Sequence, residues 1–372
     1  MAPTPIVDIH THIYPTTYLT LLRSRTEVPY LLDLPNKSAP PRLIILPSDD
    51  DPALPAHQRG RPIDSSYSSI NQKLDFMKTH DIHTSVISLA NPWLDFLSPE
   101  EGYQWAEKVN NEIEDICSTS QNSLYAFATL PLSAPSRSIV AAIECLYLLP
   151  HMRGVVLGTT GLSQGLDDPA LEPVWSALES AKLLIFLHPH YGLPSSVYGP
   201  RASEYGHVLP LALGFPMETT IAFTRMWLSG VFDRHPKLKV LIAHAGGTIP
   251  FLSGRVNSCV QHERHFPEHE YGGRGPKRDL KEVLRENVWL DAVVYSPTSV
   301  KAAVEIVGKD RVLFGTDHPF FPPLEEGREE WMSVETNVQA VTEAFGDDKQ
   351  GVTKVLGGNA IELLELNVAG AG

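Results

Sequence analysis

Residues 6–12 read Ile-Val-Asp-Ile-His-Thr-His, an apolar run that ends in two histidines two positions apart. Side chains two apart on a strand point to the same face, so His10 and His12 can converge on one point. An isolated pair of this kind is more often two ordinary surface or core histidines. At the end of an apolar strand, however, imidazoles are costly to bury unless they are bonded. The stretch therefore predicts a strand that ends in a shared binding site.

Short apolar runs like this one recur along the whole chain and alternate with helical patterns. Near-continuous apolar runs are typical of parallel strands that are covered on both sides. Strand alternating with helix predicts a parallel α/β fold, and eight units favour a closed (β/α)₈ TIM barrel over an open sheet. The predicted strands are Ile6–His12, Thr84–Asn91, Leu124–Leu130, Gly154–Gly158, Leu183–His188, Leu238–His244, Val288–Val293 and Val312–Asp317.

Three segments lie outside a minimal barrel. Residues 14–64, long and rich in proline and polar residues, predict an insertion after the first strand that packs across the barrel mouth. Residues 189–216 are dense in Tyr, Pro and Gly, which predicts an ordered active-site loop. Residues 330–364 predict closing helices at the end of the chain. No internal repeat or interdomain linker is seen, and we expect residues 1–372 to form one domain.

Composition limits the partners and the compartment. The formal net charge of -14 argues against a nucleic-acid partner. Three scattered cysteines, Cys117, Cys145 and Cys259, favour a reducing compartment over a disulfide scaffold. The first twenty residues show no signal-peptide pattern, and no apolar run reaches the ~18 residues of a membrane span. A cytoplasmic enzyme fits these limits, and a binding protein fits them equally well.

Other predicted strands also end in residues that can bind metal. The fifth ends at His188, the sixth at His244 and the eighth at Asp317. Catalytic residues of barrels come from these strand ends, so four such strands make a chance origin improbable. His10, His12, His188 and Asp317 form a set that favours Zn²⁺, although it also suits Mn²⁺, Fe²⁺ or Co²⁺.

His244 does not belong to that set. Its position predicts that it lies beside the ion in a hydrogen-bonding or acid–base role. The fourth predicted strand ends Val-Leu-Gly-Thr-Thr, and no lysine occurs from Arg153 through Ala181. A second ion bridged by a modified lysine is therefore not expected.

Together, HxH after the first strand, HPH after the fifth, AHAGG after the sixth and GTDHP after the eighth resemble the amidohydrolase superfamily. They are most similar to its decarboxylase branch, with aminocarboxymuconate semialdehyde and γ-resorcylate decarboxylases. Longer strings, such as VISLANPWLDFL, FLHPHYGLPSSVYGPR and FGTDHPFFPP, resemble the fungal isoorotate decarboxylases. The resemblance implies a barrel, one Zn²⁺ per chain, no organic cofactor and a homodimer.

The resemblance also implies site residues: the four ligands named above for the metal, His244 as a catalytic neighbour, and Arg61, Asn91 and Phe320 for the substrate. A guanidinium suits a carboxylated substrate, although a solvated loop arginine is the ordinary alternative. Asn91 ends the second strand but could equally form a turn before Pro92. Phe320 could stack on a planar ring or pack in the core, and Phe215 could do the same.

The leading hypothesis is non-oxidative decarboxylation of 5-carboxyuracil (isoorotate) to uracil and CO₂ in pyrimidine salvage. Asp317 is the hypothesised proton donor to C5, and His244 is its rival. Three alternatives stay open: decarboxylation of a hydroxybenzoic acid, hydrolysis of an amide, ester or lactone by metal-activated water, and an inactive binding or metal-storage protein.

Overall fold

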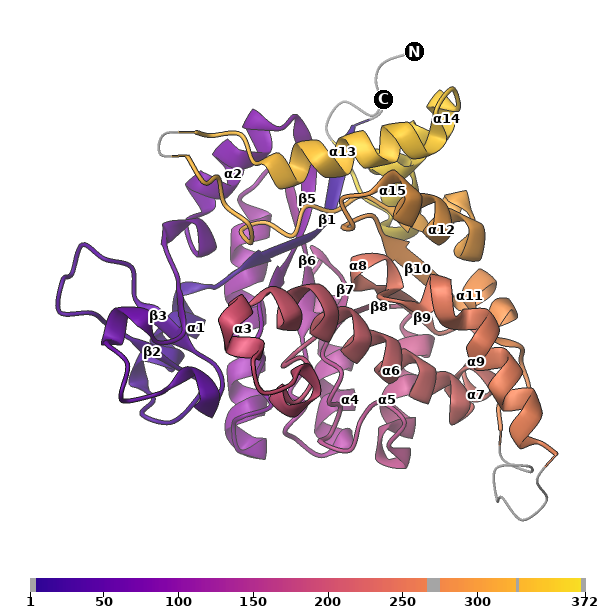
Figure 1. The fold of residues 1–372 in the computed structure, drawn as a ribbon, viewed down its shortest axis with the longest axis horizontal. Helices are drawn as coiled ribbons and strands as arrows, with labels where there is room; N and C mark the ends of the chain where they lie inside the picture. Colours follow the sequence, from indigo (N-terminus) through magenta and orange to yellow (C-terminus); the bar gives the residue numbers. More distant parts are fainter. Residues whose placement is uncertain (1–4, 266–274, 326–327, 369–372) are drawn as a thin grey trace.

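The computed structural model describes residues 5–265, 275–325 and 328–368. Its centre is a sheet of eight parallel strands, joined in chain order and surrounded by helices (Figure 1). Every neighbouring pair is parallel, as expected where a helix returns the chain to the same end of the sheet. The strands are β1 (Ile6–Ile13), β5 (Ile82–Leu89), β6 (Leu124–Thr129), β7 (Met152–Leu157), β8 (Leu184–Leu187), β9 (Lys239–Ile242), β10 (Val288–Asp291) and β11 (Val312–Leu313).

Backbone hydrogen bonds join the first strand to the chain that follows the last one. The N–H of Asp317 donates to the carbonyl of His10 at 2.7 Å, and the N–H of His12 donates to the carbonyl of His318 at 2.8 Å. The eight-stranded sheet is thus nearly closed, and the predicted (β/α)₈ barrel is confirmed. The same seam brings two of the predicted ligands on β1 next to Asp317.

Some of the helices begin with a side-chain cap. Before α3, the Ser98 side chain accepts from the N–H of Glu101, whose carboxylate reaches back to the N–H of Ser98. The helices are α1 (Thr16–Ser24), α2 (Ile70–Thr79), α3 (Pro99–Ser118), α4 (Ser136–Cys145), α5 (Glu172–Ser180), α6 (Phe215–Leu228), α7 (Val231–Arg234), α8 (Ala243–Gly246), α9 (Ile249–Glu263), α11 (Leu280–Asn287), α12 (Pro297–Val307), α13 (Met332–Phe345), α14 (Lys349–Thr353) and α15 (Asn359–Leu364). The last three are the predicted closing helices.

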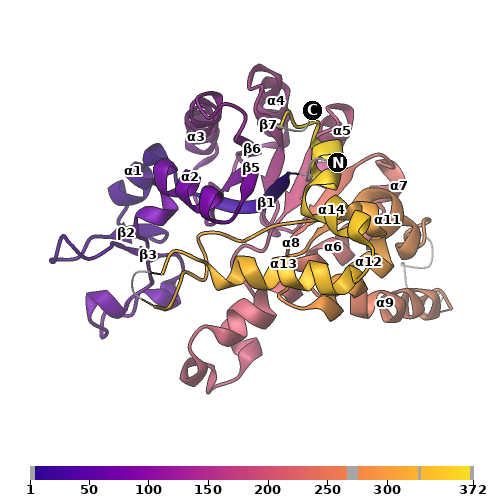
Figure 2. The same ribbon diagram turned by 90° about the horizontal axis from the view of Figure 1, so that it is seen from above.

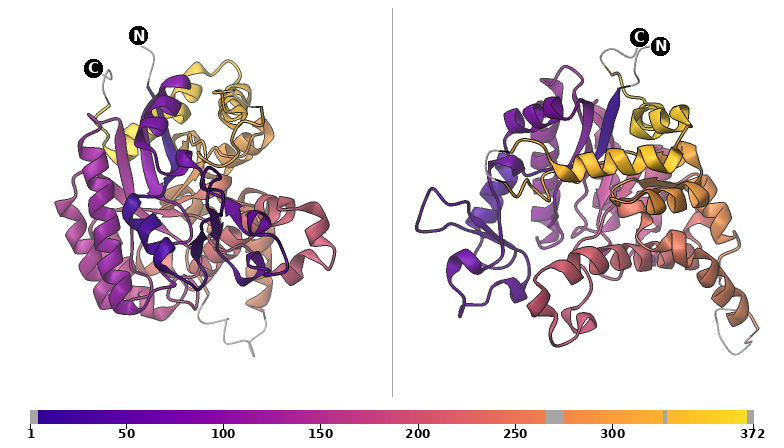
Figure 3. Two further views of the ribbon diagram at one scale, coloured as in Figure 1. Left: turned by 90° about the vertical axis from the view of Figure 1, so that its left-hand side faces the viewer. Right: turned by 45° about the horizontal axis from the view of Figure 1, so that its top comes forward.

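The segment after β1 projects to one side of the barrel (indigo in Figures 1, 2 and 3). It contains α1 and a small antiparallel sheet of β2 (Tyr30–Leu32), β3 (Arg42–Ile44) and β4 (Arg61–Pro62). Strands of two or three residues are too short to give a hydrophobic period, so the sequence did not predict this sheet. Arg61, on β4, reaches back to the carboxyl end of β5, where it contacts Asn91.

Seven of the eight predicted strands end earlier than expected, by one to four residues, and two of them show the cause. The prediction carried the eighth strand to Asp317, but β11 ends at Leu313, and Asp317 has a left-handed backbone with φ of 59°. The seventh ends at Asp291 instead of Val293, because the Asp291 carboxylate accepts from the N–H of Val293 and turns the chain there. In both cases the chain leaves the sheet where a side chain enters the site.

The predicted loop, residues 189–216, has short helical turns at Ser195–Tyr198, Ala202–Tyr205 and Pro210–Gly214 before α6 begins. Among the described residues, no helix combines the length and apolar character needed to cross a bilayer.

Candidate metal centre

Four of the residues singled out at strand ends lie together inside the barrel. Oδ1 of Asp317 is 3.3 Å from Nε2 of His10 and 3.3 Å from Nε2 of His12. The His188 ring centroid is 5.1 Å from that of His10 and 4.9 Å from that of His12. All four residues are buried. The convergence that the strand-end positions predicted is therefore present.

Each of the three imidazoles is held through its Nδ1 atom. His10 Nδ1 lies 2.6 Å from Oδ2 of Asp291, and His188 Nδ1 lies 2.7 Å from the carbonyl oxygen of Pro189. His12 Nδ1 lies 3.0 Å from the Ser88 hydroxyl. Carboxylate and carbonyl oxygens only accept, so Nδ1 carries the proton in His10 and His188. Their Nε2 lone pairs then face the shared centre, as metal ligation requires.

The Nε2 atoms of His10, His12 and His188 are buried and have no hydrogen-bond partner among the described residues. Buried polar atoms are rarely left unpaired, and a cluster of three needs an explanation. Three imidazole nitrogens beside one carboxylate form a donor set typical of Zn²⁺ and related ions. The residues present therefore fit a bound divalent ion.

Two electrostatic tendencies act in the cluster: its carboxylates favour positive charge nearby, and burial disfavours protonation of its imidazoles. Burial lowers the pKa of His10, but the carboxylates of Asp317 and Asp291 outweigh it and raise that pKa to about 10. Burial lowers the pKa of His12 to about 4 and that of His188 well below its usual range. A divalent ion satisfies both tendencies, because it supplies positive charge and binds deprotonated imidazoles.

By distance alone, one group of four potential ligands differs from the predicted ligand set by one residue. Ligand atoms of His10, His188, His244 and Asp317 lie within 4.8 Å of one another, so His244 stands where His12 was expected. Hydrogen bonding favours His12, whose Nδ1 is held while its Nε2 has no partner among the residues that the structure describes. His244 has the opposite arrangement: no described residue pairs with its Nδ1, and its Nε2 lies 3.7 Å from Oδ2 of Asp317.

Asp291, at the end of β10, supports the site although the sequence analysis did not single it out. Besides contacting His10, its carboxylate accepts from the N–H groups of His244 and Ala245 at 3.0 and 2.9 Å. These two residues have left-handed φ values of 53° and 51°, a strained backbone that such bonds help to hold. Asp291 follows the apolar run Val-Trp-Leu, so the strand-end rule applied to the other ligands could have found it.

Three of the four predicted substrate residues meet beside the cluster. A terminal nitrogen of Arg61 lies 3.3 Å from both the backbone and the side-chain oxygen of Asn91. The guanidinium carbon is 5.0 Å from the centre of the Phe320 ring, and that ring lies edge-on to His12 at 5.6 Å. Phe215, at the start of α6, lies against Gly192 on the loop that follows His188.

The remaining histidines of this region have contacts of their own. His318 stacks on Phe76, and its Nδ1 lies 2.5 Å from Nζ of the buried Lys73. His190 stacks on Tyr191, whereas His207 is exposed. His190 and His318 therefore pack around the site and do not enter the ligand cluster.

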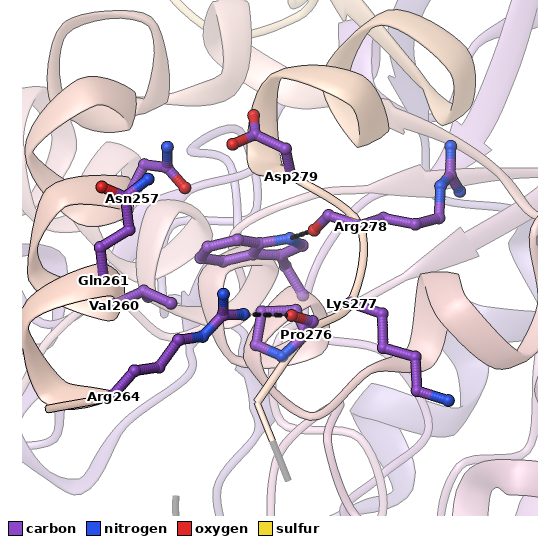
Figure 4. Close-up of a pocket in the computed structure, with 9 residues that line it drawn as sticks. Asn257, Val260, Gln261, Arg264, Pro276, Lys277, Arg278 and Asp279 are labelled. Carbon is purple, nitrogen blue, oxygen red and sulfur yellow. Dashed lines mark hydrogen bonds between the residues drawn. The ribbon is translucent and has the colours of Figure 1, made fainter. Parts of the chain in front are cut away.

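A separate pocket of about 80 Å³ lies on the outer surface between α9 and α11 (Figure 4). Trp227 lines it and donates to the carbonyl of Arg278, while Arg264 donates to the carbonyl of Pro276. Its one acidic lining residue, Asp279, caps α11. It contains none of the candidate ligand residues, and we assign it no role in the chemistry.

A nearly closed barrel that gathers imidazoles and a carboxylate at the carboxyl ends of its strands defines a metal-dependent enzyme of the amidohydrolase type. This chain belongs to that family, since the amidohydrolase family model matches residues 7–366.

Several proteins similar to this chain are named as decarboxylases. A 2-amino-3-carboxymuconate-6-semialdehyde decarboxylase of Dictyostelium discoideum is 28% identical over 316 residues, which cover 82% of this chain and 79% of the relative. A γ-resorcylate decarboxylase of a Rhizobium species is 28% identical over 265 residues, which cover 67% of this chain and 76% of the relative. The crystal structure of apo IDCase (isoorotate decarboxylase) of Metarhizium anisopliae superposes with a TM-score of 0.91 and 49% identity, covering 97% of both chains. The chain is accordingly a carboxy-lyase, similar to isoorotate decarboxylase.

Proposed function

We propose that this enzyme converts 5-carboxyuracil to uracil and CO₂, with one divalent ion, Zn²⁺, held by His10, His12, His188 and Asp317. The observation that carries the proposal is the set of contacts that Arg61 makes beside this cluster. Within the described part of the chain, its guanidinium contacts neutral oxygens and an aromatic ring, and its buried Nε has no hydrogen-bond partner. No carboxylate of the described residues lies within ion-pair distance of it. A half-buried cation of this kind suits an anionic substrate, and a guanidinium can bind a carboxylate through two parallel hydrogen bonds.

The neighbouring groups suit a flat ring with polar edges. The Asn91 amide is oriented, because its Nδ2 donates to the carbonyl of His190 at 2.6 Å. Its Oδ1 faces Arg61, so the second hydrogen of Nδ2 is available to a ring carbonyl of the substrate. Phe320 lies between Arg61 and His12 and offers an aromatic surface to a planar ring. The similarity to the Metarhizium enzyme favours a pyrimidine over a benzene ring.

A bound divalent ion would supply Lewis-acid polarisation of the substrate's carboxylate and adjacent ring carbonyl oxygens. The bond between C5 and the carboxyl carbon breaks, CO₂ leaves, and the electron pair left at C5 takes up a proton. We assign this proton to Asp317. Burial would raise the pKa of Asp317, but the charge of His10 and the other imidazoles close to its carboxylate hold that pKa well below its usual range. Asp317 therefore needs a proton source, and His244, 3.7 Å away, is placed to be that source.

A substrate panel tests the proposal. The metal-loaded enzyme is incubated separately with 5-carboxyuracil, with γ-resorcylate (2,6-dihydroxybenzoate), and with a set of amides, esters and lactones. We expect kcat/KM to be highest for 5-carboxyuracil, with equal amounts of uracil and CO₂ formed. Preference for γ-resorcylate would support the hydroxybenzoate alternative, and turnover confined to the amides, esters or lactones would identify a hydrolase.

Replacing Arg61 by Ala is expected to weaken substrate recognition. Loss of a charged hydrogen bond costs roughly 1.5–3 kcal/mol, so kcat/KM for 5-carboxyuracil should fall about ten- to a hundredfold or more. Metal content should not change, because Arg61 contacts no ligand atom. The matched control is Arg23→Ala, which removes a half-exposed arginine of the same insertion, 3.6 Å from Asp33. Kinetics of Arg61→Ala equal to the wild type would make Arg61 an ordinary loop residue.

We also propose a homodimer, formed through the apolar surface of residues 208–215 and the helix that follows. This surface presents large apolar side chains to solvent in the single chain: Val208, Leu211, Leu213 and Ile221, which are 39–63% exposed. Exposed apolar patches of this kind mark protein–protein contacts. Light scattering at micromolar concentration should report twice the chain mass. Leu213→Glu should reduce it to the monomer, whereas Leu148→Glu, at an exposed leucine after α4, should not. A monomeric wild type with full activity would refute the proposal.

A further inference from the structure

One buried carboxylate outside the ligand cluster accepts an unusual set of hydrogen bonds. Glu218, on α6, is 9% exposed and accepts from the backbone N–H groups of His190, Tyr191 and Gly192, the last at 2.8 Å. The hydroxyl of Thr159 also donates to it. Burial raises the pKa of Glu218, and these hydrogen bonds oppose the rise. No cationic side chain of the described residues pairs with it, so neutral donors alone compensate its burial.

The first peptide group bound by Glu218 also holds a proposed metal ligand. In the peptide between Pro189 and His190, the N–H donates to Glu218 at 3.1–3.2 Å. The carbonyl oxygen of the same peptide accepts from Nδ1 of His188 at 2.7 Å. A peptide group is planar, so the direction of its N–H fixes the direction of its carbonyl. Glu218 therefore sets the orientation of the His188 ring through this peptide.

The next peptide group repeats the arrangement toward the substrate residues. In the peptide between His190 and Tyr191, the N–H lies 3.4 Å from Glu218, and the carbonyl oxygen accepts from Nδ2 of Asn91 at 2.6 Å. Because Nδ2 of Asn91 is held by this bond, its Oδ1 points toward Arg61. The amide that faces the proposed ring carbonyl is thus fixed by the same carboxylate.

We infer that Glu218 is a positioning residue that couples the metal site to the substrate site, because it orients His188 and Asn91 through the two peptide groups on either side of His190. The inference rests on the proposed roles of those two residues. The arrangement of Glu218 and His188 resembles the carboxylate–histidine–metal arrangement, in which a carboxylate outside the metal site orients a histidine ligand. Here a peptide group lies between the carboxylate and the imidazole. Asp291 contacts His10 directly, whereas Glu218 acts on His188 through the peptide group between them.

The test replaces Glu218 by Gln, which keeps the shape but loses the charge and presents an N–H₂ group to the backbone donors. Affinity for Zn²⁺ is measured by competition with a chromophoric chelator, and the visible spectrum of the Co²⁺-loaded protein is recorded. Loss of an outer partner of a ligand typically weakens metal binding about ten- to a hundredfold. We expect a loss of that size, a changed Co²⁺ spectrum, and a higher KM for 5-carboxyuracil.

The matched control is Glu114→Gln. Glu114, on α3, is also 9% exposed and also binds an irregular segment, accepting from the N–H and Nδ1 of His151. His151 precedes β7 and so lies at the opposite end of the barrel from the metal ligands. We expect Glu114→Gln to alter thermal stability while its metal affinity and Co²⁺ spectrum stay those of the wild type.

Wild-type metal affinity and spectrum in Glu218→Gln would overturn the inference, as would an equal loss in Glu114→Gln. If Glu218→Gln does not fold, Glu218→Asp takes its place, since it keeps the charge but withdraws it by one methylene. A smaller loss of metal affinity in that variant supports the inference, and wild-type affinity overturns it. A wild-type enzyme that binds metal but leaves 5-carboxyuracil unchanged would refute the proposed function alone, because the metal measurements still decide the role of Glu218.

Discussion

Replacing His10 and His12 together by Ala is expected to abolish metal binding and, with it, decarboxylation. Both side chains are fully buried, and their unpaired Nε2 atoms lie 3.3 Å from Oδ1 of Asp317. The double variant leaves one of the three proposed imidazole ligands and removes the imidazole that contacts the carboxylate of Asp291. Elemental analysis should fall from about one divalent ion per chain to near zero, and turnover should fall to the uncatalysed background.

The control for this result is the double variant His151→Ala/His235→Ala. Those histidines pair with Glu114 and Glu172, away from the cluster. Its metal content should equal that of the wild type, and circular dichroism should show that both double variants remain folded. An unchanged metal stoichiometry in a folded His10→Ala/His12→Ala protein would refute the ligand assignment.

Asp317→Asn is expected to bind substrate but fail in turnover. Asparagine keeps the shape and an oxygen that can face the metal, but it has no acidic proton to deliver to C5. General acid catalysis typically contributes about 10²–10⁴-fold, so kcat should fall by at least about a hundredfold. Metal should bind weakly or normally, so the assay is run at saturating metal, and binding of 5-carboxyuracil is measured separately by calorimetry.

His244→Asn separates the two proton donors. If Asp317 delivers the proton and His244 supplies it, Asp317→Asn should be the more damaging change, and His244→Asn should keep part of the activity. His244 is partly exposed and lies 3.7 Å from Asp317, so solvent can also supply that proton. A near-wild-type rate in Asp317→Asn together with an inactive His244→Asn would show that the proton comes from His244.

The sequence predicted the barrel because parallel strands covered on both faces leave a strong local signal. Each of the eight predicted runs overlaps an observed strand. The ends of the strands were less predictable. For example, β11 is only Val312–Leu313, and the chain then turns at Asp317, which has a left-handed backbone conformation. Such an end depends on the seam with β1, a contact across some three hundred residues. The small sheet of the insertion was missed because its strands are too short to show a period.

The residues of the candidate site were predictable where they follow an apolar strand. They were not predictable where they act on the site through groups that are distant in the sequence. His10, His12, His188 and Asp317 all satisfy the strand-end rule. Asp291 satisfies it too but was overlooked beside the histidines. Glu218 could not have been found this way, because it lies on a helix and binds backbone groups about 28 positions earlier.

The most direct test of the proposed reaction is to run it in D₂O with the metal-loaded enzyme and follow the products by mass spectrometry. Non-oxidative decarboxylation with proton delivery at C5 predicts uracil that carries one deuterium at C5, formed in equal amount with CO₂, and no product once the metal is removed by a chelator. A metal-loaded enzyme that leaves 5-carboxyuracil unchanged, or that still releases uracil and CO₂ after its metal is gone, would contradict the account.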